Sequence, residues 1–363
     1  MRDLLAERLL AEVMSWTPED VASERPALQA MATYKYDEYQ QFSPGMRFVE
    51  SLALWLEQFK DNEDKALAYQ FVKSRMIFFS AAETAHIVSI AYPDFIRPKL
   101  LQRAAKELSI HSKYLNKIYK SKEFRALQRR SICLGLSDGA HIDIFRRSNQ
   151  SELSHEQILQ TYDISSDKAS DVLDNLIKDL TNILRGSPKL QDQYFNTVIL
   201  LDDFSGSGIT YKRKIEKFYK GITDPNTSLS KLFNLKDIHI IIVVYIATKT
   251  ARTYLENNIK EILPAGVNWS IEVVQPLLDH ISLNSVETPN YLKIVNKYYD
   301  SDVEDEHFRK GGQADAKLGF GKCALPLVLN HNTPNNSVFL LWAYTNLSVR
   351  GLFPRVSRHR SLM

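Results

Sequence analysis

The chain is poor in cysteine, lacks long apolar stretches and carries little net charge. Of its 363 residues only two are cysteines, and the formal net charge is +3. Two cysteines cannot build a zinc ribbon, and Cys133 and Cys323 lie in apolar runs typical of buried free thiols in a reducing compartment. No apolar stretch approaches the ~18–20 residues needed to span a bilayer. We therefore expect a cytoplasmic protein without membrane contact, and the flat charge does not by itself argue for nucleic acid.

Familiar catalytic motifs are also missing. The scattered histidines show no metal-binding spacing such as His-Glu-x-x-His. No Gly-x-Ser-x-Gly nucleophile elbow is present. The sequence thus gives no support for a zinc protease or for a hydrolase with a catalytic triad.

The distribution of apolar residues predicts two kinds of architecture along the chain. Residues 1–130 have helical spacing, as in Leu5, Leu9 and Val13, which share one helical face. Beyond residue 130, apolar and β-branched runs predict strands at 131–136, 197–201, 240–246, 271–274 and 323–329. Helical stretches, including acid-rich 151–184, separate several of these strands. This alternation predicts a parallel α/β sheet.

These patterns divide the chain into three ranges. We expect an N-terminal helical region at 1–125, an α/β domain at 126–355 and a basic tail at 356–363.

The most informative motif follows the strand expected at 197–201. Two carboxylates, Asp202 and Asp203, come directly after the apolar run, and a loop of small residues leads from them into a helical segment. The loop residues are Ser205, Gly206, Ser207, Gly208 and Thr210. Backbone N–H groups of such a loop and of the helix N-terminus can converge on a phosphate.

Carboxylates beside a phosphate would repel it unless something else engages them. Sugar hydroxyls are donors that Asp202 and Asp203 could accept, and Mg²⁺ brought by the substrate would screen the remaining charge. The motif therefore predicts a ribose-phosphate site. The alternative is an ordinary glycine–serine turn after a core strand.

A second polar loop follows the strand expected at 131–136. Ser137, Asp138 and Gly139 could cradle another anion, with Arg146 or Arg147 donating to a pyrophosphate. The alternative is a surface turn with two solvated arginines.

Two further clusters allow either a functional or a structural interpretation. Asn335, Asn336 and Trp342 could recognise a base, although turn chemistry and core packing explain them as well. Residues 97–130 contain eleven Lys and Arg against two Glu, with tyrosines interleaved. That stretch is either a nucleic-acid or partner-binding face or a solvated helical face.

The loop at 202–210 resembles the phosphoribosyl-diphosphate (PRPP) loop of type I phosphoribosyltransferases. The wider set of motifs resembles a phosphoribosyltransferase-like effector family of bacterial conflict systems, known from some retron-type antiphage loci. The residues that carry this second resemblance are 136–140 with Arg146 and Arg147, 202–208, 334–336, Trp342 and 353–355. The resemblance implies a type I phosphoribosyltransferase-like parallel sheet core with an N-terminal helical region.

The resemblance also implies roles and partners. Asp202 and Asp203 would hold the ribose, 205–210 the 5′-phosphate, and 137–139 with Arg146 or Arg147 the departing pyrophosphate. PRPP or a nucleotide would be the ligand and would bring Mg²⁺. A reverse transcriptase with its non-coding nucleic acid, and a DNA-binding protein of the same locus, would be the partners.

The sequence departs from the purine-salvage enzymes at Gly206, where they carry an aspartate that acts as general base. Glycine cannot accept a proton. The resemblance therefore implies ribose-phosphate binding but puts the usual purine acceptor chemistry in doubt. Two hypotheses remain: a glycosyl transferase or glycosidase acting as a defence effector, and a sensor that binds a nucleotide or nucleic acid without turnover.

Overall fold

The computed structural model describes residues 3–304, 315–344 and 349–355, and the chain forms two compact units. Unit 1 combines residues 1–84 with 278–363, and unit 2 is the continuous segment 85–277. These units do not coincide with the ranges expected from the sequence. Residues 85–125 pack with the α/β sheet, and 278–355 pack with the N-terminal helices, because contacts rather than chain order define the units. The tail at 356–363 lies outside the described residues.

Unit 2 is an α/β unit built on five strands. The strands are β2 (Ser131–Gly135), β3 (Ile158–Leu159), β4 (Thr197–Ser205), β5 (His239–Thr248) and β6 (Asn268–Leu277). The helices are α5 (Ala81–Ile90), which crosses the unit boundary, α6 (Arg97–Glu107), α7 (Leu115–Tyr119), α8 (Lys122–Arg129), α9 (Ile142–Ser148), α10 (Ser166–Leu184), α11 (Ile209–Thr223) and α12 (Lys249–Ile262).

All neighbouring strands of this sheet run parallel, in the order β3-β2-β4-β5-β6. The parallel α/β sheet predicted from the sequence is therefore confirmed. Because β3 lies outside β2 while β4 lies on its other side, the chain changes direction between β2 and β4. Ligands of open α/β sheets bind at the carboxyl ends of strands at such a switch point.

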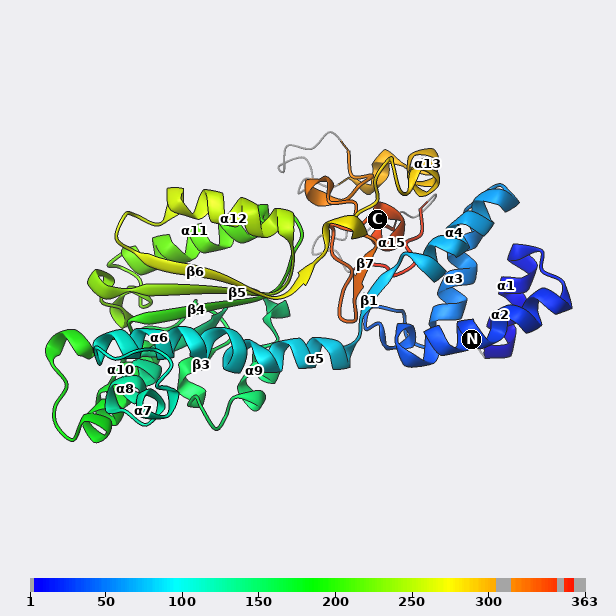
Figure 1. Ribbon diagram of the computed structural model, residues 1–363. Coiled ribbons are helices and arrows are strands. Elements are labelled where there is room, and N and C mark those ends of the chain that lie inside the picture. The colour runs from blue at the N-terminus through cyan, green and yellow to red at the C-terminus, as the bar shows by residue number, and fades with distance from the viewer. Residues whose placement is uncertain (1–2, 305–314, 345–348, 356–363) are drawn as a thin grey trace. The chain divides into compact units, whose positions relative to one another are not determined.

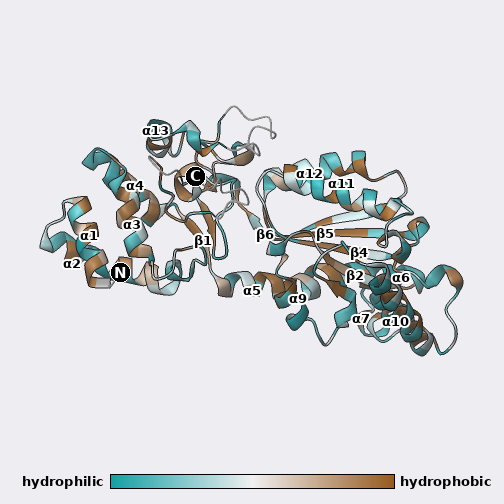
Figure 2. Ribbon diagram, turned by 180° about the vertical axis from the view of Figure 1, so that it is seen from behind, coloured by the Kyte–Doolittle hydropathy of each residue, from teal (hydrophilic) through white to brown (hydrophobic). Residues whose placement is uncertain are grey.

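Both faces of the sheet are buried, as the continuous apolar runs require. Alternate residues of β2, β4 and β5, such as Leu134, Leu200 and Ile242, pack with α10, α11 and α12 in one core. A π-helical turn, η2 (Ala91–Ile96), packs on β5 and β6. Figure 1 shows α11 and α12 along one side of the strands and α6 along the other. In Figure 2 the strands are mainly apolar, whereas the surrounding helices alternate between hydrophilic and hydrophobic residues.

Unit 1 consists of helices around a short parallel strand pair. Its elements are α1 (Asp3–Met14), α2 (Pro18–Tyr34), α3 (Phe48–Glu57), α4 (Asn62–Ser74), β1 (Ile77–Phe79), α13 (Pro289–Lys297), β7 (Leu327–Leu329) and α15 (Phe339–Trp342). The strand expected at 323–329 corresponds to β7, which pairs with β1 rather than with the main sheet. Expecting only helices before residue 130 was therefore wrong at β1.

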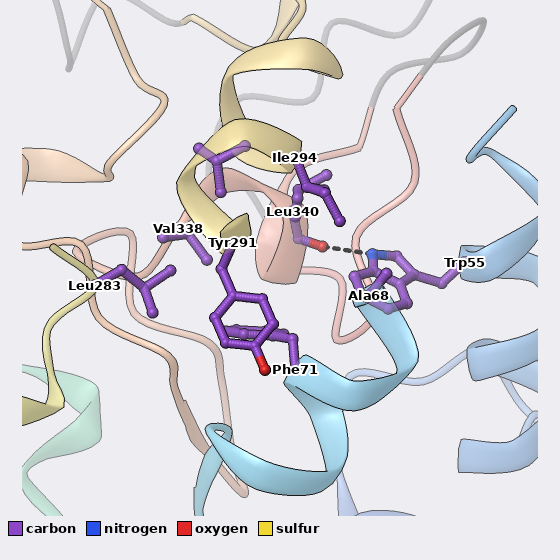
Figure 3. A pocket seen from close by; sticks show the side chains of 9 residues that line it. Trp55, Ala68, Phe71, Leu283, Tyr291, Ile294, Val338 and Leu340 are labelled. Carbon is purple, nitrogen blue, oxygen red and sulfur yellow. Dashed lines mark hydrogen bonds between the residues drawn. The ribbon is translucent and has the colours of Figure 1, made fainter. Parts of the chain in front are cut away.

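The interior of unit 1 joins its two chain segments. The indole N–H of Trp55 donates to the carbonyl of Leu340 at 2.8 Å, and the two residues line a small apolar cavity with Phe71 and Tyr291 (Figure 3). Its volume of about 20 Å³ has room for little more than one water molecule. The cavity is thus a packing defect rather than a ligand site. Among the described residues, no helix has the length and apolar character needed to cross a membrane.

Candidate functional site

Asp202 and Asp203, the two carboxylates predicted to bind ribose, both lie within β4, near its carboxyl end. The strand continues to Ser205, beyond the end at residue 201 expected from the apolar run. Successive side chains of a strand point to opposite faces. Asp202 therefore lies on the face covered by α11, and Asp203 lies on the other face.

Asp202 is held by two side chains and by the backbone N–H of Asp203, which donates at 3.3 Å. Its carboxylate is 1% exposed and accepts a hydrogen bond from the ammonium of Lys214 at 2.5 Å. The hydroxyl of Ser137 donates to its other oxygen, Oδ1. Burial, and then repulsion from Asp203, raises the pKa of Asp202 to about 6, against the opposing effect of Lys214. Asp202 thus ties the loop after β2 to β4 and α11.

Asp203 is half-buried and faces the loop after β2. Its Oδ1 accepts a hydrogen bond from the N–H of Phe204 at 2.8 Å. A Cβ at Gly139 would stand 2.5 Å from Asp203 Oδ2, so a larger residue there would have to displace this carboxylate. The two predicted anion loops are therefore in contact, through Ser137 with Asp202 and through Gly139 with Asp203.

The loop between β4 and α11 is shaped by Gly208 more than by Gly206. Gly208 is the N-cap of α11 and takes a left-handed conformation, with φ of 80°. A Cβ there would stand 2.8 Å from Tyr254 and 2.9 Å from the carbonyl of Ala251. Gly208 has no capping side chain, and the N–H of Ile209 donates to the hydroxyl of Ser207 at 3.4 Å. The next N–H groups of the first turn of α11 can therefore point toward an anion.

The remaining loop residues differ in exposure. Ser205, Gly206 and Ser207 are buried, whereas Thr210 is exposed. The hydroxyl of Thr248 donates to the carbonyl of Gly206 at 2.6 Å, which fixes the loop to the end of β5. The loop is thus held at both ends while Thr210 faces solvent.

The two predicted arginines form contacts outside these loops. Both lie on α9 after the loop at 137–140. Arg146 donates to the carbonyl of Ile158 at 2.8 Å, which links α9 to β3. Arg147 is 74% exposed and pairs with Asp143 at 2.9 Å, one helical turn away. Arg147 therefore matches the solvated alternative.

The predicted base-recognition residues belong to unit 1. Asn336 is buried and donates to the carbonyl of Phe320 at 2.7 Å, and the carbonyl of Asn335 accepts from the N–H of Phe320. The indole N–H of Trp342 donates to the carbonyl of Ser337 at 2.8 Å. These contacts give all three residues structural roles within their own unit.

Two further residues of the site were not identified from the sequence. Lys214 reaches Asp202 from the second turn of α11, and a lysine on a basic helix gives no signal of that contact. Tyr245 lies on the Asp203 face, because its neighbours Val244 and Ile246 pair with Asp202 and Phe204. Its hydroxyl is buried and has no hydrogen-bond partner within the described part of the chain. In the sequence, the only sign of this residue was a tyrosine within the otherwise apolar run of β5.

The site contains oxygen ligands for a cation but no closed metal cage. Within 3–304, 315–344 and 349–355, no three His, Cys, Asp or Glu side chains gather as metal ligands. Mg²⁺ is commonly held by one or two carboxylates together with substrate phosphates. Asp203, half-buried between the two loops, could supply one such carboxylate.

Comparison with known proteins gives a single result that bears on the site. The PRTase-CE family model, which describes phosphoribosyltransferase conflict-system effectors, matches residues 52–355. The chain belongs to this family. No curated protein and no solved structure matches the chain.

Proposed function

We propose that unit 2 binds the ribose 5-phosphate part of PRPP or of a nucleotide, and that this member of the PRTase-CE family uses the site for glycosyl transfer or glycosidic cleavage in antiphage defence. One observation carries the proposal. The loops after β2 and β4 meet at the switch point of the parallel sheet, joined through Ser137 and Asp202. That is the position at which such sheets bind ligands.

The chemistry of each loop suggests its share of the ligand. The N-terminus of α11 and the loop 205–208 offer N–H groups and hydroxyls to the 5′-phosphate. Asp203, with one oxygen near the second loop, would accept from ribose hydroxyls. The loop 137–139 would face the pyrophosphate or the nucleotide phosphates. Mg²⁺, if bound with the ligand, would neutralise phosphate charge through Asp203.

In a transfer reaction the bond from the anomeric carbon to the pyrophosphate oxygen breaks, and a bond to the acceptor forms. The bonding electrons leave with pyrophosphate. The protein would contribute by orienting the ribose through Asp203 and by stabilising the leaving charge with the N–H groups of 137–139. The proposal assigns no role to Arg146 or Arg147, because Arg146 donates to the carbonyl of Ile158 in β3 and Arg147 pairs with Asp143 on α9.

A second function, nucleotide sensing without turnover, is favoured by a specific observation. Asp202, one of the two expected ribose carboxylates, is already neutralised by Lys214 and buried. Gly206 offers no base at the position that salvage enzymes use. A sensor needs the phosphate cradle but neither the second carboxylate nor the base.

Turnover separates the two functions. We would measure pyrophosphate release from PRPP with Mg²⁺ and pooled bases, nucleosides and nucleic acid, and base release from nucleotides. The transferase or glycosidase function predicts turnover that Asp203→Asn abolishes and that Lys220→Ala, an exposed site at the far end of α11, leaves unchanged. Saturable nucleotide binding without any product would instead establish the sensor.

The partners implied by the family are part of the same proposal. A reverse transcriptase with its non-coding nucleic acid and a DNA-binding protein would assemble with this chain. Co-purification from the intact locus tests this, and recovery of the chain alone would contradict it.

A further inference from the structure

The basic stretch at 97–130 separates into two groups of side chains. Five of its cations are tied into the fold: Arg97 to Glu152, Lys99 to Glu272, Arg103 to Thr197, Arg129 to Asp179 and Arg130 to Asp192. The other six are exposed, and none forms an ion pair with another described residue: Lys106, Lys113, Lys117, Lys120, Lys122 and Arg125. We call this second group, with the residues between them, the basic surface (106–125).

Little negative charge opposes the basic surface. The only carboxylates within 106–125 are Glu107 and Glu123. Desolvation raises the pKa of Glu107, against the opposing effect of Arg103 and Arg130. Six exposed cations thus face solvent with two carboxylates in their own segment. Glu152, which accepts from the hydroxyl of Tyr119, is paired with Arg97. An anionic partner would neutralise the remaining positive charge.

The basic surface also exposes large apolar side chains. Tyr114 is 63% exposed, Leu115 57% and Tyr119 46%. The rings of Tyr114 and His111 are nearly perpendicular, at 6.4 Å between ring centres, whereas Tyr119 packs on Phe124 at 5.4 Å. Tyr114 therefore offers a ring face among lysines. Interleaved cations and aromatic faces are what single-stranded nucleic acids bind, since phosphates pair with the cations and bases stack on the rings.

The backbone under the basic surface is firmly held. Ile118 of α7 and Phe124 of α8 are buried, and the hydroxyl of Ser121 caps α8 by accepting from the N–H of Phe124 at 3.1 Å. The cations are thus presented by an ordered scaffold, so binding would not have to fold it first.

The basic surface is separate from the ribose-phosphate site. Arg103 of α6 donates to Thr197 at 2.5 Å, which places this part of α6 at the first residue of β4. The candidate site lies at the opposite end of β4. Substitutions on the basic surface therefore leave the site intact.

We propose that the basic surface binds single-stranded nucleic acid, with its lysines on the phosphates and Tyr114 stacked on a base. If all six cations contact phosphates, the logarithm of the binding constant falls with the logarithm of salt concentration with a slope of about −4. This inference does not depend on the function proposed for the other site.

The test is fluorescence anisotropy of the full chain with single-stranded DNA and RNA of about 20 nucleotides and with a duplex of the same length, at several salt concentrations. The main variant is Lys113→Glu/Lys117→Glu/Lys120→Glu. Its matched control, Lys178→Glu/Lys220→Glu/Lys260→Glu, reverses three exposed lysines on α10, α11 and α12. A second variant, Tyr114→Ala, removes the ring and leaves the charge unchanged. Circular dichroism confirms that each variant is folded.

We expect the main variant to weaken single-strand binding at least ~10-fold and to flatten the salt slope by about 2. Tyr114→Ala should weaken single-strand binding about 10-fold and duplex binding little. The control should bind as the wild type does. The proposal would be overturned if the control lost as much affinity as the main variant, or if Tyr114→Ala weakened single-strand and duplex binding equally. It would also be overturned if polyaspartate or anionic vesicles bound as tightly as single-stranded nucleic acid.

Discussion

Asp202, which lies against Asp203 and Lys214, gives the site a pH dependence. Its pKa is raised to about 6 in the folded protein, mainly by burial, whereas an aspartate in an unfolded chain titrates near about 3.9. Between these values the folded state binds more protons than the unfolded state. The contribution to stability is therefore fully present below about pH 4 and is lost as the pH rises through 6.

We predict that Asp202→Asn, which cannot ionise, abolishes this loss. The free energy of unfolding of the wild type, relative to that of the variant, should fall by roughly 2 kcal/mol between pH 4 and pH 6.5. Urea unfolding of both proteins at several pH values measures the difference. A difference that stays constant across this range would show that Asp202 does not titrate there.

At the scale of elements, the junction of β4 and α11 depends on a single glycine. Gly208 combines a φ of 80° with close approaches to Tyr254 and to the backbone of Ala251. This backbone conformation alone costs other residues about 1–3 kcal/mol. A side chain at position 208 would also lie too close to the carbonyl of Ala251, and this backbone group cannot rotate away to relieve the contact.

We predict that Gly208→Ala lowers the free energy of unfolding by at least ~1–3 kcal/mol. Gly186→Ala is the matched control, because Gly186 has no positive φ and a Cβ there meets nothing within 4 Å. The control should change stability by no more than ~1 kcal/mol. Chemical denaturation compares the two, and equal stabilities would contradict the described junction.

The elements also show what the sequence could and could not predict. Buried parallel strands are nearly all apolar, so β2, β4 and β5 were recognised, and the apolar centre of the edge strand β6 was recognised as well. The ends of these strands were not predicted. The two-residue strand β3 and the pair β1 and β7 are too short to leave a pattern. Their pairing depends on segments far apart in the chain, as between Phe78 and Val328.

The site was predictable as far as local sequence determines it. The sequence predicted that the loops at 137–139 and 202–208 both follow strands of one parallel sheet. In the structure these strands, β2 and β4, are neighbours, and the two loops meet. Strand alternation, however, separates Asp202 from Asp203 once β4 continues to Ser205. The partnership of Asp202 with Lys214 depends on how α11 packs on the sheet. Neither follows from a motif alone.

At the scale of the whole molecule, the two units differ in chain continuity. Unit 2 is one segment with its own core, whereas unit 1 needs both ends of the chain to form the pair β1 and β7. A continuous unit with a complete sheet can fold alone.

We predict that a fragment of residues 81–277, which keeps all of α5, unfolds cooperatively and binds PRPP within about threefold of the full chain, a difference of less than ~1 kcal/mol. Circular dichroism during urea unfolding and ligand titration test both parts. A fragment that folds but does not bind would show that unit 1 contributes to the site.

The central claim is that a ribose 5-phosphate binds where the loops after β2 and β4 meet. Calorimetric titration with PRPP and Mg²⁺ tests it most directly, using the wild type, Asp203→Asn, Gly139→Ala and the control Lys220→Ala. We predict saturable binding that Asp203→Asn and Gly139→Ala each weaken at least ~10-fold, or about 1.4 kcal/mol, and that the control retains. Absence of binding at millimolar ligand, or equal binding by all four proteins, would contradict the claim.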